Sequence, residues 1–114
     1  MRRFRHLTVL AVTVTALTFT TQSSQAATLT EVTGFGSNPG NLRMFVYVPT
    51  GLATNRPLVV ALHGCSQTAA SYDNETGWTK WADAYGFALV LPQQQNSNNA
   101  GKCFNWFLPA DQTR

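Results

Sequence analysis

His63, Gly64 and Cys65 directly follow an apolar segment, LVVAL at positions 58–62, and precede a polar one. In open α/β sheets, ligands bind beyond the carboxyl ends of the strands, where this triplet is expected to lie. A glycine lets the backbone approach a ligand, and the amide N–H groups at the start of a following helix have no intrahelical acceptor. Such donors can stabilise the negative charge that develops on a carbonyl oxygen during acyl transfer. The alternative is a plain turn between a strand and a helix.

Cys65 and Cys103 are the only cysteines of the sequence. An even pair in a secreted chain is most simply a disulfide. The alternative is a zinc site with His63 as a third ligand, but structural zinc sites usually have four ligands and a closely spaced cysteine pair, which this sequence lacks. No cofactor and no metal is therefore expected.

Residues 1–26 have the pattern of a secretory signal peptide, which predicts an extracellular protein. Arg2, Arg3 and Arg5 form a positive start, an apolar run with threonines follows, and SQA at positions 24–26 suits cleavage. A membrane anchor is the alternative, but a spanning helix needs about 20 predominantly apolar residues. Cleavage after Ala26 would remove the arginines that account for the formal net charge of +3. The remaining charges are scattered and balanced, so neither nucleic acid nor a membrane is expected as a partner.

The rest of the chain alternates between strand and helix patterns. Strands are predicted at 27–36 and 42–49, joined by the turn residues SNPGN into an antiparallel hairpin. Two further strands, at 58–64 and 87–92, are apolar without alternation, which is typical of a parallel sheet covered on both faces.

A helix is predicted between the last two strands, after a helical segment that begins near Thr68. Its apolar residues follow helical spacing and share one face: Trp78, Trp81, Ala82 and Tyr85. The two tryptophans of this face are expected in the core. Thr76 is the expected N-cap, and Gly86 is placed to end the helix in a left-handed turn. Strand, helix and parallel strand together predict a βαβ unit and an α/β fold.

Three motifs carry a family resemblance: HGCSQ at 63–67, GWTKWADAYGF at 77–87 and CFNWF at 103–107. Together they resemble the extracellular polyhydroxybutyrate depolymerase type of esterase, which shares the α/β-hydrolase fold with acetylxylan and feruloyl esterases. The hairpin segment GFGSNPGNLRMFVYVP is similar too, so the resemblance covers Thr28 to about Asp111. It implies a serine hydrolase that cleaves carboxylic esters, in polyhydroxyalkanoate or as acetyl or feruloyl groups on xylan, through an acyl-enzyme.

The resemblance also implies roles for individual residues. The backbone N–H of Cys65 would be an oxyanion donor supported by Gly64, and Cys65 would be bonded to Cys103. Trp106 would lie near the mouth of the substrate cleft, although an aromatic residue of this kind also serves for packing. His63 is expected to be a structural histidine, because its role in the resembling family is structural. A general base is the alternative.

The catalytic triad of that fold is missing from the sequence. No G-x-S-x-G occurs, and the histidines are His6 and His63. Ser66 and Ser71 have no base and are not expected to act as nucleophiles. Residues 27–114 are therefore interpreted as the amino-terminal part of an α/β-hydrolase esterase domain, truncated before the nucleophile, acid and base and inactive alone. A noncatalytic secreted polymer-binding module and an inactive truncation product are the alternatives.

Overall fold

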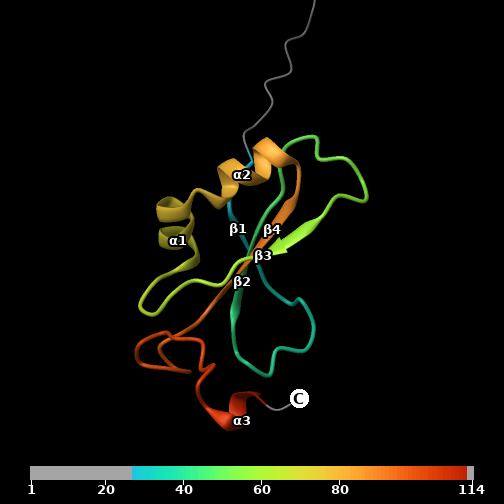
Figure 1. The fold of residues 1–114 in the computed structure, drawn as a ribbon. Coiled ribbons are helices and arrows are strands. Elements are labelled where there is room, and N and C mark those ends of the chain that lie inside the picture. The colour runs from blue at the N-terminus through green and yellow to red at the C-terminus, as the bar shows by residue number, and fades with distance from the viewer. Residues whose placement is uncertain (1–26, 113–114) are drawn as a thin grey trace, which may run out of the picture.

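A mixed sheet forms the centre of the computed structural model, which describes residues 27–112 (Figure 1). The predicted signal peptide, 1–26, lies outside the described residues. The sheet has four strands in the order β1-β2-β4-β3. Along the chain the elements are β1 (Thr30–Val32), β2 (Arg43–Tyr47), β3 (Leu58–Val60), α1 (Ala69–Thr76), α2 (Trp78–Tyr85), β4 (Ala88–Gln93) and α3 (Pro109–Gln112).

The strand pairing confirms the predicted hairpin and the predicted βαβ unit. Strands β1 and β2 pair antiparallel, and β3 and β4 pair parallel, with α1 and α2 forming the connection between them. The sequence reasoning did not foresee that β4 also pairs antiparallel with β2, which joins the two units into one sheet. The described chain is thus an α/β fold.

The crossover consists of two short helices that lie next to each other and contact β4 (Figure 1). Helix α1 begins after Thr68, close to the expected start, and Thr68 caps it: its hydroxyl accepts a hydrogen bond from the Ser71 N–H, and the Ser71 hydroxyl accepts one from the Thr68 N–H. The prediction of Thr76 as the N-cap of the second helix was wrong, because Gly77, with φ of 71°, ends α1 and begins α2. Gly86, with φ of 67°, ends α2 as predicted. Within residues 27–112, none of the helices has the length and apolar character needed to cross a membrane.

The core contains one tyrosine and several alanines and leucines from the strands, the helices and the residue after β3: Tyr47, Ala61, Ala69, Ala82, Leu89 and Leu91. Trp78 packs against this cluster, as predicted. The prediction that Trp81 is also in the core was wrong, because Trp81 is half-exposed and stacks on the exposed ring of Tyr85. Ala82 is the α2 residue buried in the core, and its neighbour Trp81 lies about 100° away around the helix axis.

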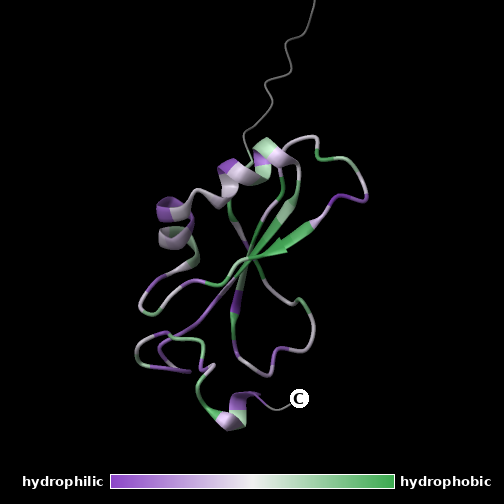
Figure 2. Cartoon of the chain, in the orientation of Figure 1, coloured by the Kyte–Doolittle hydropathy of each residue, from purple (hydrophilic) through white to green (hydrophobic). Residues whose placement is uncertain are grey.

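Strand β3 forms one edge of the described sheet and exposes apolar side chains. Leu58, Val60 and the following Leu62 are more than half exposed, at 61%, 57% and 53%. Figure 2 shows β3 as one of the most hydrophobic segments of the chain. The sequence predicted cover on both faces of this strand, and the described residues supply it for Val59 and Ala61, on the opposite face.

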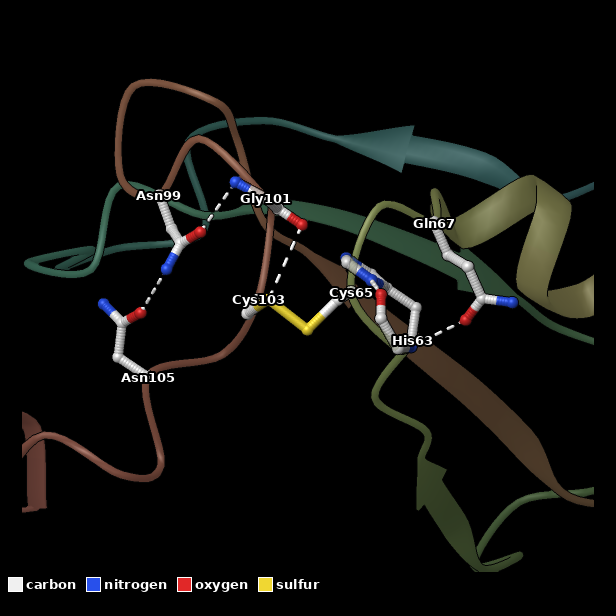
Figure 3. Close-up of a disulfide and its surroundings, with 8 residues drawn as sticks. His63, Cys65, Gln67, Asn99, Gly101, Cys103 and Asn105 are labelled. Carbon is white, nitrogen blue, oxygen red and sulfur yellow. Dashed lines mark hydrogen bonds between the residues drawn. A yellow bond between two sulfur atoms is a disulfide. The ribbon is translucent and has the colours of Figure 1, made fainter.

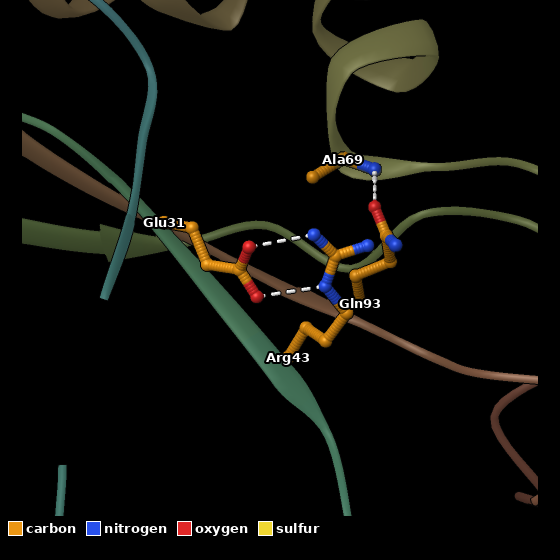
Figure 4. A network of polar contacts seen from close by, with 4 residues as sticks. All are labelled: Glu31, Arg43, Ala69 and Gln93. Carbon is orange, nitrogen blue, oxygen red and sulfur yellow. Dashed lines mark hydrogen bonds and ion pairs between the residues drawn. The ribbon is translucent and has the colours of Figure 1, made fainter. Parts of the chain in front are cut away.

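Polar side chains connect β4 to α1 and β2 to β1 (Figure 4). Gln93 at the end of β4 is buried, and its side-chain oxygen accepts a hydrogen bond of 2.9 Å from the Ala69 N–H, which satisfies a free amide at the start of α1. Arg43 on β2 donates to both carboxylate oxygens of Glu31 on β1, at 2.7 and 2.6 Å. The hydrogen bond from Arg43 lowers the pKa of the Glu31 carboxyl.

Two polar side chains from outside the helix hold α2, one at Asp83 and one at its carboxyl end. The hydroxyl of Tyr47 on β2 lies 2.8 Å from each carboxylate oxygen of Asp83. Burial, together with the hydrogen bond to Asp83, raises the pKa of Tyr47 to about 12. Arg56 donates to the carbonyl oxygens of Gly86 and Tyr85 at 2.7 and 3.0 Å, so a positive charge lies at the carboxyl end of α2.

Candidate functional site

The segment between β3 and α1 forms a tight turn at the carboxyl end of the parallel strands. The Gly64 carbonyl oxygen accepts a hydrogen bond of 3.3 Å from the Gln67 N–H, which closes the turn. Ser66 at its third position has φ of 65°. A serine in this left-handed region costs roughly 1–2 kcal/mol, so surrounding contacts must maintain the conformation.

The backbone N–H groups of the turn differ in their use. The Gly64 N–H donates to the Gln67 side-chain oxygen at 2.7 Å, and the Ser66 N–H donates to the Gly101 carbonyl oxygen at 2.7 Å. Within residues 27–112, the N–H of Cys65 has no hydrogen-bond acceptor. Cys65 as a whole residue is exposed, so the turn that carries this donor lies at the surface. The resemblance noted in the sequence implied this N–H as an oxyanion donor, with Gly64 as the residue that supports it.

The ring of His63 is buried next to the turn and contacts the backbone of Gly64, which confirms the prediction of a structural histidine. The residue is only 4% exposed. Its Nε2 accepts a hydrogen bond of 3.0 Å from the Gln94 N–H, and its Nδ1 lies 2.6 Å from the Gly64 carbonyl oxygen. Both contacts fit a neutral ring with the proton on Nδ1. The ring also contacts Phe104, at 5.0 Å between centroids, so His63 has both nitrogens engaged and is no free base.

The disulfide between Cys65 and Cys103 is present, as predicted (Figure 3). It joins the turn to the loop before α3, and the Ser66–Gly101 hydrogen bond joins the same two segments. Asn99 organises that loop: its side chain accepts from the Gly101 N–H at 2.8 Å and donates to the Asn105 side chain at 2.6 Å. Because both sulfur atoms form the disulfide, neither cysteine offers the thiolate that the alternative of a zinc site requires.

Trp106 lies on the surface next to a hollow of about 690 Å³. Its side chain is 77% exposed and contacts Phe107 edge to face. The hollow is lined by aromatic, apolar and amide residues and one aspartate: Pro39, Gly40, Leu42, Gln94, Asn98, Phe104, Asn105, Trp106, Ala110 and Asp111. Gln94 and Phe104 also contact His63, so the hollow and the turn share a wall.

Several residues that hold the turn were missed by the sequence reasoning. Gln67, Gln94 and Gly101 contact its backbone or His63. Gln67 had a local signal, because it closes the HGCSQ motif three positions after Gly64. Gln94 and Gly101 are distant in the sequence, and their positions depend on the pairing of β4 and on the disulfide.

An α/β sheet with an amide donor after its third strand is compatible with a hydrolase, and the comparisons with known proteins define the class. The family model described as Esterase PHB depolymerase matches residues 42–113. This covers more than half of the chain, so the chain belongs to that family, and the resemblance predicted from the motifs is confirmed.

Particular relatives agree with this assignment. Poly(3-hydroxyalkanoate) depolymerase C of Paucimonas lemoignei is 56% identical over 92 residues, which are 81% of this chain and 22% of that protein. Feruloyl esterase B of Neurospora crassa is 45% identical over 87 residues, 76% of this chain and 30% of that protein. The solved structure of an acetyl xylan esterase from Aspergillus awamori aligns with a TM-score of 0.53 and 40% identity, over 57% of this chain and 24% of that one. The chain thus spans less than a third of the length of these relatives.

Proposed function

We propose that this chain forms the oxyanion-hole segment of a secreted serine esterase with an α/β-hydrolase fold. The observation that carries the proposal is the Cys65 N–H, which lies in the turn between β3 and α1 and has no acceptor among the described residues. In α/β-hydrolases, one oxyanion donor is a backbone N–H from the loop that follows the third strand. The disulfide, the Ser66–Gly101 hydrogen bond and buried His63 all hold this turn, which supports a role that needs a fixed donor.

The chemistry assigned to Cys65 is electrostatic. When a serine oxygen attacks the carbonyl carbon of an ester, the carbonyl oxygen gains negative charge, and a fixed N–H stabilises that charge more than it stabilises the bound ester. The alcohol then leaves with a proton, and water hydrolyses the acyl-enzyme by the same route. The sequence contains no G-x-S-x-G and no histidine after His63, so the proposal assigns the nucleophile, acid and base to residues other than these 114.

The proposed substrate is a polymeric carboxylic ester. Exposed Trp106 and partly exposed Phe104 give the hollow an apolar wall, while Gln94 and Asn105 supply amide groups that hydrogen-bond ester or hydroxyl oxygens. The names of the relatives include a poly(3-hydroxyalkanoate), a feruloyl ester and an acetylated xylan, and each combines apolar and oxygen-rich parts.

Secretion is part of the proposal. Disulfides persist in oxidising compartments, and the Cys65–Cys103 bond supports such a location. The signal-peptide pattern of residues 1–26 points to the same location.

A hybrid enzyme tests the proposal. In this hybrid esterase, the aligned 92 residues of the Paucimonas lemoignei depolymerase are replaced by the matching residues of this chain. We expect it to be secreted and to hydrolyse a soluble short-chain nitrophenyl ester as well as polyhydroxybutyrate. A folded hybrid without hydrolysis would contradict the proposal.

Gly64→Val in the hybrid esterase tests the donor itself. A Cβ at Gly64 would lie 2.9 Å from the Gln67 side-chain oxygen, so the turn has to shift. We expect kcat to fall on the order of 10²-fold with little change in KM, as for the loss of one oxyanion donor. Ala53→Val, at an exposed loop position, is the matched control. Unchanged turnover in a folded Gly64→Val variant would remove Gly64 and Cys65 from the site.

A noncatalytic polymer-binding module is the second candidate. It is favoured by the exposure of consecutive apolar residues, Trp106, Phe107 and Leu108, on one surface. Binding of this chain to insoluble polyester, lost in Trp106→Ala and without hydrolysis in the hybrid esterase, would support this candidate instead.

A further inference from the structure

We infer that Gln67 is a positioning residue for the Cys65 N–H and that Glu75 holds the Gln67 amide in its working orientation. The inference rests on the proposed function, because that function gives the Cys65 N–H its role. It concerns residues that do not touch the ester and act through the backbone of Gly64.

Gln67 holds Gly64 at both of its backbone polar groups. Its side-chain oxygen accepts the Gly64 N–H at 2.7 Å, and its own N–H donates to the Gly64 carbonyl oxygen at 3.3 Å. Figure 3 shows the Gln67 side chain reaching from the start of α1 back to the turn. The Nδ1 of His63 makes a third contact with Gly64, at its carbonyl oxygen.

These contacts determine where the Cys65 N–H points. The Gly64 carbonyl group and the Cys65 N–H belong to the same peptide unit, which is planar and trans, so the two groups point in opposite directions. The Gly64 carbonyl oxygen is held by the Gln67 N–H and by His63, and the Cys65 N–H is therefore aimed away from them. The Gly64 N–H is consumed by Gln67 and does not compete for the same carbonyl oxygen of an ester.

Glu75 selects one of the two orientations of the Gln67 amide. The Gln67 amide nitrogen donates to the Glu75 carboxylate at 2.6 Å. A carboxylate only accepts hydrogen bonds, so the nitrogen must face Glu75 and the oxygen must face the Gly64 N–H. Reversal of the amide would place two oxygens together at Glu75 and an N–H against the Gly64 N–H.

A charge exchange between the two side chains tests the inference in the hybrid esterase. In Gln67→Glu, two carboxylates meet at the 2.6 Å contact, so the side chain at position 67 should leave and release Gly64. At pH 8 we expect kcat to fall about tenfold with KM within twofold, the size expected for one net hydrogen bond. Toward pH 5 the activity relative to the unchanged hybrid should recover, because a close carboxylate pair binds a proton more tightly than a single carboxylate does.

The double variant Gln67→Glu/Glu75→Gln should restore kcat at pH 8. The carboxylate at position 67 then accepts from the Gly64 N–H and from the new amide at position 75, so the bridge is complete again. Asn74→Asp is the matched control, because it adds a carboxylate beside Glu75 on the exposed side of α1 without contacting Gln67, and it should keep normal turnover. A double variant no faster than Gln67→Glu, or a Gln67→Glu variant whose loss is in KM alone, would overturn the inference.

Amide hydrogen exchange separates this inference from the proposed function. In Gln67→Ala the Gly64 N–H loses its acceptor, so its exchange in the hybrid should accelerate about tenfold, whereas the core amide of Leu89 should not change. This readout does not need hydrolysis. If the hybrid is inactive but exchange at Gly64 is faster in Gln67→Ala, the proposed function is refuted and the positioning of Gly64 by Gln67 stands. If exchange at Gly64 is unchanged in Gln67→Ala, the positioning is overturned, even where the hybrid is active.

Discussion

Removing the Cys65–Cys103 disulfide should lower the free energy of unfolding of the hybrid esterase by about 4 kcal/mol. The bond spans a sequence separation of 38 residues. The chain-entropy relation, −2.1 − 1.5R ln n, then gives an entropy loss of about 13 cal/mol/K in the unfolded state, or about 4 kcal/mol at 25 °C. The sequence has no other cysteine, so no second disulfide can compensate for the loss of this bond.

The variant for this prediction is Cys65→Ala/Cys103→Ala, which leaves no free thiol and keeps the backbone N–H at position 65. Urea unfolding followed by tryptophan fluorescence gives the free energy of unfolding for the oxidised hybrid and for the variant. Mass spectrometry of unreduced peptides from the oxidised hybrid should show the 65–103 link. We also expect kcat to fall more than KM changes, because the Ser66–Gly101 hydrogen bond then holds the turn to its neighbouring loop without covalent help.

Cys103→Ala alone is the matched control for the disulfide. It removes the bond and retains the Cys65 side chain, so it should unfold at the same urea concentration as the double variant. A loss below about 1 kcal/mol in both variants would refute the chain-entropy reasoning, because strain in the folded state or structure in the unfolded state would then offset the predicted gain.

Three further predictions concern stability. Gly86→Ala should lower the free energy of unfolding of the hybrid in urea by roughly 1–2 kcal/mol, because φ is 67° and the new Cβ would lie 2.7 Å from an Arg56 nitrogen. Ala84→Gly, on the exposed face of α2, should lower it by less. The opposite order of the two losses would contradict the role of Gly86 as the cap of α2. Burial and Asp83 raise the pKa of Tyr47 from 10.0 to about 12, so the folded state holds this proton to a higher pH than the unfolded chain does. The stability that results is complete below pH 10 and is lost as the pH rises to 12. Tyr47→Phe should lack this loss when the free energy of unfolding in urea is measured between pH 9 and 12, and the same dependence on pH in both proteins would refute the assignment. Residues 27–114 expressed alone should aggregate and hydrolyse no ester, and a monomer with cooperative unfolding in light scattering and urea titration would favour the binding module instead.

The elements of this fold could be predicted where a local pattern has one physical solution. Apolar runs without alternation identified β3 and β4 as parallel partners, and Gly86 marked the end of α2 because few other residues adopt its conformation. The boundary between the two helices of the crossover was placed at Thr76 instead of Gly77, since a threonine can cap a helix with its side chain and stands next to the glycine. The exposure of Trp81 was missed because helical spacing says which residues share a face, and not how wide a strip of that face the sheet covers.

The candidate site divides in the same way. The strand end followed by glycine suggested backbone donors at this turn, and the family resemblance assigned one of them to Cys65. The pair of cysteines suggested the disulfide from residue type and number alone, although 38 positions separate them. Beyond the local contacts of Gln67, the donor is held by contacts from Gly101 in a distant loop and from Gln94 directly after β4. No local pattern contains them, because they exist only after β4 has inserted between β2 and β3.

The uncovered side of β3 connects the fold to the proposed reaction. Leu58 and Val60 point away from the helices, and Val59 points toward them, so the strand is apolar on both faces, as strands inside parallel sheets are. An edge of this kind favours the addition of another strand.

A strand that paired parallel to β3 would end at the same side of the sheet as the turn that follows β3, because the carboxyl ends of parallel strands lie together. In the proposed hydrolase this is where a serine on a strand-to-helix turn has to stand to attack a carbonyl group whose oxygen is held by the Cys65 N–H. The apolar edge that should make the isolated chain aggregate is thus the surface through which a nucleophile would be brought to its oxyanion donor.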